Sequence, residues 1–597
     1  MKTLLSLAAL AALSCPAYAD DATLQPEVIV SATRVPETVD ATLASVTVIT
    51  REEIERAQAP DLLSLLRRVA GVDLARTGGT GQSTGLFLRG TASNQSLVLV
   101  DGVRVASSNS GLFDFAHLPP DQVERIEIVR GPRAAYWGSD AIGGVVQIFT
   151  RRPDGYGAHA YGGRYGLYGG SVEAGVSGER GGIGVTLGGE SFDGYSATKP
   201  SGFGFDPDDD GYINRNASLN ANLAAGSQRL ALHALSTDAD VEFDQGRTNA
   251  VNRSVGLSVA GPLGTGWEHE LVIGVAREDL DTPAFFSLFQ SRRANLDWQH
   301  HVALGPAALV FGVNLEHARG ESRDTFSGEP EYDATRNNEA AFAGVQGASG
   351  HLDWQLAGRY DHDSAFGGAT TPQLALGWQQ TDALRFVASY GEGFRAPGLN
   401  ELYSPGFGGL FAGNPELEPE RSDTVELGLD WHPPAAGRLG LRAYRTRIDE
   451  LISFSGGETF QAENVARARI DGAELEYGWA AGPWRVDASA TWQDPVDESN
   501  GGLLLRRPRE KAALAVGYRF DSGCTLGGDG YAASRRRDFG GELGGYALAN
   551  LYGACPLGRA FRLELRLDNA LDRDYTLVQG YATPGRSVFV GIRWRGP

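Results

Sequence analysis

One five-residue segment has the spacing of a catalytic serine. Gly81-Gln82-Ser83-Thr84-Gly85 matches the G-x-S-x-G turn, in which a serine nucleophile sits between a strand and a helix. That chemistry needs a helix directly after the turn, and an acid and then a histidine later in the chain. Here a glycine-rich stretch surrounds the motif, and no helical pattern follows it. We therefore predict that the chain is not an enzyme.

Four aspartates have the spacing of a cation site. Asp206, Asp208 and Asp210 alternate just before Gly211, and Asp244 lies in the next predicted outer loop. Clustered carboxylate oxygens of this kind suit Ca²⁺. An EF-hand is excluded, because the twelfth position of the loop is Ala217 rather than glutamate and no helices flank it. The alternative is an acidic loop exposed to water, and the residues leave both interpretations open.

Composition narrows the class of protein. The chain has 597 residues with 80 glycines, one methionine and a net charge of -21. No apolar run after the N-terminal segment reaches the roughly 18 residues of a transmembrane helix. Nucleic acid is not expected as a partner, because phosphate binding needs a basic face.

The N-terminal region predicts export and a docking strand. Residues 1–19 have a positive start, an apolar run from Leu4 to Leu13 and a small-x-small cleavage site, which is the pattern of a signal peptide. Residues 20–40 are polar and extended apart from one apolar run. That run could be an ordinary edge strand, but its polar flanks favour a strand offered to a partner by β-augmentation. It comprises Glu27, Val28, Ile29, Val30, Ser31 and Ala32.

Residues 41–153 predict a small mixed α+β domain. A strand over Val46–Thr50 precedes a helix, whose start has the capping-box spacing of Thr50 and Glu53. Leu97–Val100 and Ile126–Val129 are short apolar runs between glycine-rich turns, which indicates buried strands. Polar, glycine-rich loops lie between these elements.

In residues 154–597, apolar and polar residues alternate along the sequence with a period of two. Phe561, Leu563, Leu565 and Leu567 alternate with charged residues, which predicts strands with one apolar and one wet face. Tight turns such as PLGTG and PPAAGR are separated by long acidic or glycine-rich stretches, a pattern typical of outer-membrane barrels. At about 10 residues per strand and a similar allowance for connections, the region predicts roughly 22 antiparallel strands. A barrel that wide needs a filler, and the preceding domain is the candidate plug for its lumen.

Two cysteines remain after the predicted signal peptide. Cys524 follows the short turn Asp521-Ser522-Gly523, and Cys555 precedes the turn that starts at Pro556. Both should therefore lie at the short-turn rim of neighbouring antiparallel strands, in a compartment that permits oxidation. We expect a disulfide; the alternative is two unpaired small residues, since a register slip of one would point them to opposite faces.

Several segments together resemble the TonB-dependent outer-membrane transporters over the full mature length. EVIVSA at 27–32 resembles the TonB box, and LVLVDGVRV and VERIEIVRGPRAAYWGSDAIGGVVQI resemble the plug. SYGEGFRAPGLNELY with GNPELEPERS, and NALDRDY, resemble barrel segments. The resemblance implies an all-β barrel in outer-membrane lipid with the plug in its lumen, coupling to TonB, and action as a monomer. Among family members, LRGTASNQSLVLVDGVRV, LLLRRPREKA and GYATPGR are most similar to those that carry cobalamin.

The ligand residues follow from that resemblance alone. It implies corrinoid contacts at Ser83, Gly85, Ala92, Asn109, Ser110, Arg506 and Phe539, and calcium in the aspartate loops, where Ser196 replaces one aspartate. Ala92 and Phe539 replace polar or hydroxyl-bearing residues, so the pocket must differ. Uptake of an iron chelate, a siderophore or haem, is the alternative. Phe394-Arg395-Ala396-Pro397 and Asn414-Pro415 resemble segments of haem receptors, but no histidine lies between Pro397 and Asn414 to ligate iron.

Overall fold

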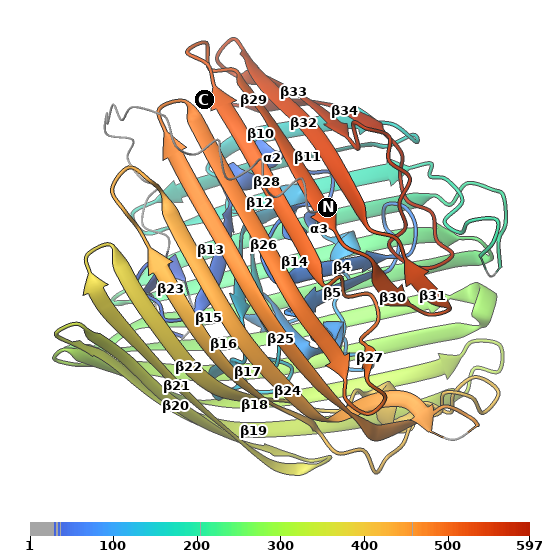
Figure 1. The fold of residues 1–597 in the computed structure, drawn as a ribbon, viewed down its shortest axis with the longest axis horizontal. Helices are drawn as coiled ribbons and strands as arrows, with labels where there is room; N and C mark the ends of the chain where they lie inside the picture. The colour runs from blue at the N-terminus through green and yellow to red at the C-terminus, as the bar shows by residue number, and fades with distance from the viewer. Residues whose placement is uncertain (1–28, 31–33, 36, 203, 457, 597) are drawn as a thin grey trace.

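The computed structural model describes residues 29–30, 34–35, 37–202, 204–456 and 458–596. The predicted signal peptide, and Glu27, Val28, Ser31 and Ala32 of the predicted docking strand, lie outside these residues. Figure 1 shows a wide barrel of tilted strands around an N-terminal domain drawn in blue.

Twenty-two antiparallel strands close the barrel, which confirms the predicted fold. Each strand pairs with its neighbour in sequence, and the last pairs with the first, with Gly157 opposite Arg595. A two-residue segment, β27 (Gly502–Leu503), adds to the edge of β26. The strands are β10 (Gly155–Gly163), β11 (Tyr168–Gly178), β12 (Gly181–Phe192), β13 (Tyr212–Ala225), β14 (Gln228–Phe243), β15 (Gly246–Gly264), β16 (Trp267–Thr282), β17 (Ser287–Leu304), β18 (Ala307–Asp324), β19 (Pro330–Ser349), β20 (Leu352–Asp363), β21 (Gly367–Thr381), β22 (Leu384–Arg395), β23 (Glu420–Trp431), β24 (Arg438–Gly456), β25 (Gln461–Ala481), β26 (Trp484–Asp497), β28 (Glu510–Arg519), β29 (Thr525–Ala533), β32 (Tyr546–Leu557), β33 (Phe561–Asp568) and β34 (Ser587–Arg595).

Successive side chains along each strand point alternately toward the lipid and toward the lumen. On β23, Val425 and Leu427 are exposed on the outer face, whereas Thr424 and Glu426 are buried against the plug. Apolar residues therefore face outward and polar ones inward, as expected for a barrel in lipid. The long connections 193–211, 396–419 and 569–586 leave one rim, here called the outer rim, and short turns such as 558–560 join strands at the inner rim. The outer-rim connections also hold η4 (Pro283–Phe285), α5 (Leu399–Tyr403), β30 (Arg536–Asp538) and β31 (Gly541–Leu543).

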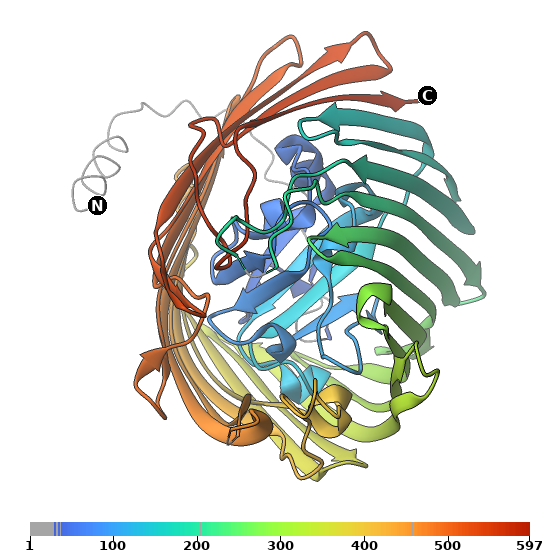
Figure 2. The ribbon, with the colours of Figure 1, turned by 90° about the vertical axis from the view of Figure 1, so that its right-hand side faces the viewer.

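The plug fills the lumen (Figure 2). Its five-stranded sheet has the order β3-β8-β9-β6-β7, and a separate hairpin joins β4 to β5. The two apolar runs predicted as buried strands are β6 and the second half of β8. The elements are β1 (Ile29–Val30), β2 (Glu37–Thr38), β3 (Ser45–Thr50), α2 (Arg51–Ala57), α3 (Leu62–Leu66), β4 (Val72–Arg76), β5 (Thr84–Leu88), η1 (Ser93–Gln95), β6 (Ser96–Val100), β7 (Val103–Arg104), η2 (Phe115–His117), η3 (Pro120–Gln122), β8 (Val123–Arg130), α4 (Ala134–Trp137) and β9 (Gly144–Thr150).

The single helix predicted after Thr50 is in fact two. The capping box of Thr50 and Glu53 is present and starts α2 as predicted. Gln58 then adopts a left-handed backbone, with φ of 48°, which ends the helix. Pro60 follows, and the Asp61 carboxylate caps α3 by accepting from the Ser64 N–H. Within the described residues, no helix is long and apolar enough to cross a membrane.

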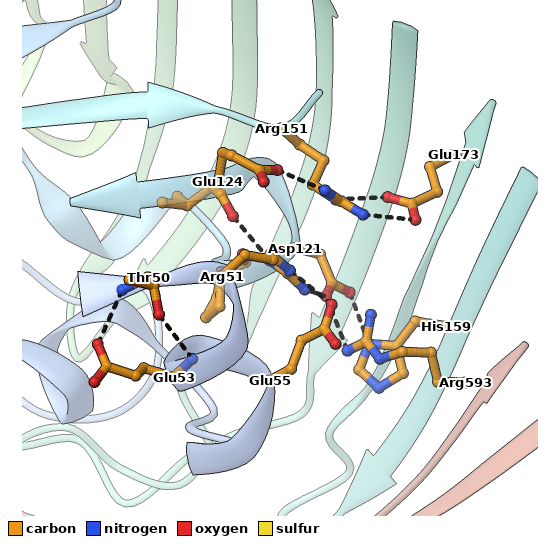
Figure 3. A network of polar contacts seen from close by, with 12 residues as sticks. Thr50, Arg51, Glu53, Glu55, Asp121, Glu124, Arg151, His159, Glu173 and Arg593 are labelled. Carbon is orange, nitrogen blue, oxygen red and sulfur yellow. Dashed lines mark hydrogen bonds and ion pairs between the residues drawn. The ribbon is translucent and has the colours of Figure 1, made fainter. Parts of the chain in front are cut away.

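Ion pairs anchor the plug at the seam where β34 meets β10 (Figure 3). Arg595 on β34 reaches both oxygens of Glu55 on α2, each at 2.6 Å. Asp121 lies 2.7 Å from Nδ1 of His159 on β10 and 3.3 Å from Arg593 on β34. Burial would raise the pKa of Glu55, but the guanidinium groups of Arg51, Arg593 and Arg595 lower it to about 2. Charged side chains from both ends of the barrel sequence thus meet on one face of the plug.

Candidate functional site

The plug presents three of the predicted ligand residues around the short turn η1. Ser83 is exposed at the base of the loop between β4 and β5, directly before β5, and its carbonyl accepts from the Thr77 N–H. A Cβ at Gly85 would lie 3.2 Å from Ser93 Oγ, so the backbone of β5 runs directly beside η1. Ala92 caps the other side of the same turn and is partly exposed. The Ser83 segment continues into β5 rather than a helix, as predicted when we excluded the nucleophile turn.

Asn109 and Ser110 belong to a neighbouring loop and differ in how far their side chains are accessible to a ligand. Asn109 is 2% exposed, its Nδ2 donates to the Gln290 carbonyl, and its Oδ1 accepts from the Tyr332 hydroxyl. Its amide is therefore engaged with the barrel wall rather than facing the outer opening. Ser110 is partly exposed, and its Oγ accepts from the Leu112 N–H. Gly111 lies against Asn94, which joins this loop to η1.

The barrel brings Arg506 and Phe539 together. The Arg506 guanidinium donates from Nε to Asp538 Oδ1 at 2.8 Å and lies 5.6 Å from the Phe539 ring centre. Phe539 is 70% exposed, so an aromatic face and a charged donor stand side by side at the outer rim. The adjacent Arg507 turns the other way, because it donates to the carbonyls of Gly90 and Thr91 on the plug.

The last outer connection contributes to the site in a way that the residue pattern did not predict. Residues 569–586 fold into the lumen, where Val578 is 2% exposed and packs against Ala75 and Phe87 of the plug. The Gln579 N–H donates to Asp538, the same carboxylate that holds Arg506. This loop therefore forms part of the wall of the outer opening. No local pattern in residues 569–586 indicates that it folds inward.

The aspartate loop is tied together by hydrogen bonds. Asp244 Oδ1 accepts from the Asp206 N–H at 3.1 Å, and Ser196 Oγ lies 2.9 Å from the Asp206 carbonyl and 3.2 Å from Asp244 Oδ1. Asp210 Oδ2 accepts from the Ala197 N–H at 2.6 Å. Asp210 and Asp244 are buried, whereas the side chains of Asp206 and Asp208 are exposed.

The carboxylate groups around Asp210 repel one another. Burial raises the pKa of Asp210 to about 6; the Ala197 N–H lowers it, and the neighbouring carboxylates, led by Asp244, raise it. In the described part of the chain, no group of three or more histidine, cysteine, aspartate or glutamate side chains is arranged to hold a metal ion. The structure thus brings the acidic residues of two adjacent outer connections together without arranging a finished coordination shell.

The two described residues of the predicted docking strand form a hairpin with their own chain. Ile29 pairs with Thr38 and Val30 pairs with Glu37. The chain is next fixed at Arg34, whose guanidinium pairs with Asp297 on the barrel and lies 4.2 Å from the Trp137 ring centre. A partner strand at this segment would compete with the hairpin for backbone hydrogen bonds.

Buried ion pairs also join the plug to the wall at β23 and β25. Arg89, 1% exposed, pairs with Glu426 and Glu474 on the barrel, the latter through two contacts of 3.0 Å. Arg130 donates to Glu476 at 2.6 Å. Between this wall and β3, toward the inner rim, lies a cavity of about 350 Å³ lined by Ser45–Ile49 and by barrel residues that include Arg442.

Cys524 and Cys555 are joined as a disulfide, with Cα atoms 4.1 Å apart. Thr525 pairs with Ala554, so the next position toward the inner rim places the two cysteines opposite each other. This is the rim on which the strand and turn pattern placed them.

Comparisons with known proteins agree with the architecture. Residues 147–570 match the family described as "TonB dependent receptor-like, beta-barrel", and residues 38–145 match the "TonB-dependent Receptor Plug Domain". The vitamin B12 transporter BtuB of Vibrio vulnificus is 30% identical over 626 residues, and that of Photobacterium profundum is 31% identical over 632; both alignments cover 100% of each chain.

Solved structures share the fold at lower identity. The ferric enterobactin receptor of Pseudomonas aeruginosa superposes with a TM-score of 0.78 at 19% identity, covering 93% of this chain and 98% of that one. The copper transporter OprC has a TM-score of 0.78 at 19% identity, covering 92% and 98%. With a plug inside a closed barrel and family matches across both, this chain belongs to the TonB-dependent receptors and is a TonB-dependent transporter of the outer membrane.

Proposed function

We propose that this transporter takes up cobalamin or a related corrinoid. The observation that carries the proposal is the similarity of about 30% to vitamin B12 transporters over the full length of both chains. The structural likeness to siderophore and metal receptors, at 19% identity, supports the shared fold alone.

The outer opening supplies suitable chemistry for such a ligand. Ser83, Ser110 and the backbone beside Gly85 and Ala92 can meet the amide groups at the edge of a corrinoid. Arg506 presents fixed donors beside the exposed ring of Phe539. Small residues at Gly85 and Ala92 leave room for a bulky, flat molecule. Asn109 would contribute indirectly, because its hydrogen bonds to the barrel hold the Ser110 loop in place.

Calcium and TonB complete the proposal. A Ca²⁺ ion bound by Asp206, Asp208, Asp210 and Asp244 would neutralise the repulsion in their loop, with carboxylate ligands that suit a hard cation. The same loop contacts the inward-folded one, since the Lys199 N–H donates to the Gly580 carbonyl. Energy would enter through Glu27–Ala32, where TonB adds a strand and pulls through backbone hydrogen bonds.

Equilibrium binding on the purified full chain tests the substrate. Cyanocobalamin, ferric enterobactin and haemin are titrated separately, and we expect tight binding of cyanocobalamin only. Arg506→Ala should weaken that binding about tenfold or more, because it removes hydrogen bonds from a charged donor. Arg535→Ala is the matched control, since Arg535 lies in the neighbouring outer connection, between β29 and β32, with its side chain 75% exposed.

Ser83 offers a second pair of variants. Ser83→Trp should block the opening and weaken cyanocobalamin binding, while Ser83→Ala keeps the space and should change it little. Tight binding of an iron chelate in place of the corrinoid would overturn the proposed substrate. Unchanged affinity in both Arg506→Ala and Ser83→Trp would move the site elsewhere in the barrel.

A further inference from the structure

Four arginines stand directly opposite one another on four adjacent strands. Arg253 on β15 pairs with Arg277 on β16, Arg277 with Arg292 on β17, and Arg292 with Arg319 on β18. We call these four residues the arginine row. All four share the outward parity of their strands: Ser254, Ala276, Arg293 and Ala318, each next to a member of the row, are buried toward the lumen. Arg253 and Arg292 are exposed, and the side chains of Arg277 and Arg319 are each 39% exposed.

The arginine row lies at one edge of the lipid-facing band. On β15 and β16 the next outward positions toward the inner rim are apolar, with Val255 opposite Val275 and then Leu257 opposite Ile273. On β17 and β18 the corresponding positions are Ala294 and His317, followed by Leu296 opposite Leu315. On β16 the band ends at Trp267, ten residues before Arg277. Ten residues span about 33 Å along a strand. A tilt of about 40° reduces this to about 25 Å, the height of the apolar band of an outer-membrane barrel. The row therefore sits at the headgroup level of the outer leaflet.

Such a row is unfavourable by itself. Like charges directly opposite each other on neighbouring strands destabilise a sheet. Two members have carboxylate partners: Arg277 lies 2.6 Å from Asp279, and Arg319 lies 2.5 Å from Asp333 and 3.5 Å from Glu321. Among the residues that the structure describes, Arg253 and Arg292 have no ion pair, so at least two positive charges face outward without a counter-ion from the protein.

The wall at β23–β25 shows a different arrangement of outward charges. On β23, β24 and β25, Arg447 stands opposite Asp423, and Arg445 stands opposite Asp471, which it contacts at 2.5 Å. There aspartates stand among the outward arginines, since Arg447 lies between Asp423 and Arg469, and Arg421 stands opposite Asp449. The arginine row has no aspartate directly across the ladder, because its members face one another and, at the two ends, Ser236 and Thr335.

We propose that the arginine row binds the phosphates of an outer-leaflet glycolipid whose acyl chains lie along the apolar band below. Guanidinium groups bind phosphate oxygens with paired hydrogen bonds, and basic clusters beside a membrane attract anionic headgroups. The occupant is a lipid rather than a free anion, because Val255, Leu257, Val275 and Ile273 continue the site into the acyl region. Diphosphorylated lipid A has both parts, a phosphorylated sugar head and several acyl chains.

Native mass spectrometry on the full chain in neutral detergent tests this site. The probes are diphosphoryl lipid A, the same lipid without phosphates, and inorganic phosphate as a competitor. The variant Arg253→Gln with Arg292→Gln removes the two unpaired charges at exposed positions. Each arginine near an anionic lipid contributes about 1 kcal/mol, so the pair should weaken lipid A binding about tenfold or more. Arg445→Gln with Arg467→Gln is the matched control, since both are exposed outer-rim arginines that already pair with aspartates.

We expect the wild type and the control variant to bind diphosphoryl lipid A equally, and the lipid without phosphates to bind weakly to both. Wild-type affinity in the Arg253/Arg292 variant would overturn the assignment, as would an equal loss in the control. Competition by millimolar inorganic phosphate would show a free-anion site and overturn the lipid assignment. Circular dichroism and heat-induced mobility shift verify that both variants keep the barrel.

Discussion

At the scale of single residues, the aspartate loop shows how position changes the chemistry of one side-chain type. Asp206 and Asp208 are exposed, whereas Asp210 and Asp244 are buried within hydrogen-bond distance of backbone amides or hydroxyls. Burial raises the pKa of Asp210 to about 6, and the Asp244 carboxylate adds to the rise. Because this pKa is raised, the protonated loop is the more stable form, and that stability is lost as pH rises through about 6.

The first prediction follows from the direction of the Asp210 pKa shift. Above pH 6 the charged Asp210 needs a cation, so added Ca²⁺ should tighten ligand binding and a chelator should weaken it. Below about pH 5 the proton replaces the cation and both effects should shrink. Titrating the ligand with and without calcium at pH 5 and pH 7.5 measures this, with Asp210→Asn as a variant that should bind equally with or without calcium. A calcium effect of the same size at both pH values would contradict it.

Cys524 and Cys555 give the second prediction. The bond closes a segment with a sequence separation of 31 between two neighbouring strands. Constraining the unfolded chain in this way should stabilise the protein by roughly 3 to 4 kcal/mol. We expect denatured protein to react with maleimide only after reduction, and Cys524→Ser with Cys555→Ser to unfold more easily in denaturant. Labelling of both thiols without a reductant would show that the bond is absent.

At the scale of elements, the pairing of the N-terminal segment with its own chain is short, so a competing strand can displace it. The hairpin of β1 and β2 has two residues per strand, which is too short to be stable alone, and the Arg34 contacts follow directly. A pull on this segment would next load β3, which is an edge strand paired only with β8 and lies beside the cavity of about 350 Å³. The ion pairs at the β34–β10 seam hold α2 and η3 on another face of the plug.

The third prediction concerns the docking strand. Val28→Pro or Val30→Pro removes a backbone donor and disfavours strand pairing. Uptake of labelled ligand by whole cells should be lost while surface binding is retained, because the outer opening lies on the far side of the plug. Val28→Ala serves as control, since it keeps the amide. Normal uptake by the proline variants would rule out this segment as the coupling strand.

At the scale of the whole molecule, buried ion pairs hold the plug together with small apolar clusters shared with the wall, such as Ile142 with Tyr444 and Ile448. Arg89, Arg130, Glu426 and Glu474 are all buried at its boundary with the wall. A barrel of this size has an open lumen unless it is filled. The plug contacts therefore decide whether the molecule leaks.

The fourth prediction tests this boundary. Arg89→Gln removes the guanidinium group that pairs with both Glu426 and Glu474. Breaking a buried ion pair in this way lowers the free energy of unfolding by about 3 kcal/mol or more. The loosened plug should give a higher ion conductance in planar bilayers than the wild type. Arg125→Gln is the control, because Arg125 pairs with Glu127 inside the plug. Equal conductance in all three proteins would mean that other contacts hold the plug.

The sequence by itself determined the architecture. Alternation along a strand and the contrast between short turns and long connections are local properties, so β10–β34 and their number could be predicted from residue patterns. The capping box at Thr50 and the buried runs in β6 and β8 were visible for the same reason. The break between α2 and α3 was missed, although Pro60 and Asp61 lie at it, because one continuous apolar face spans both helices.

Only the tertiary structure decided which residues meet. Asn109 looks like any loop residue, yet a wall residue far along the chain takes up its amide, and Val578 packs on the plug through an inward-folded loop. The arginine row consists of four unremarkable outward positions until the register of β15–β18 aligns them. Register and loop docking depend on contacts between distant parts of the chain, which no local pattern encodes. Local periodicity therefore specifies the barrel, and long-range pairing specifies its sites.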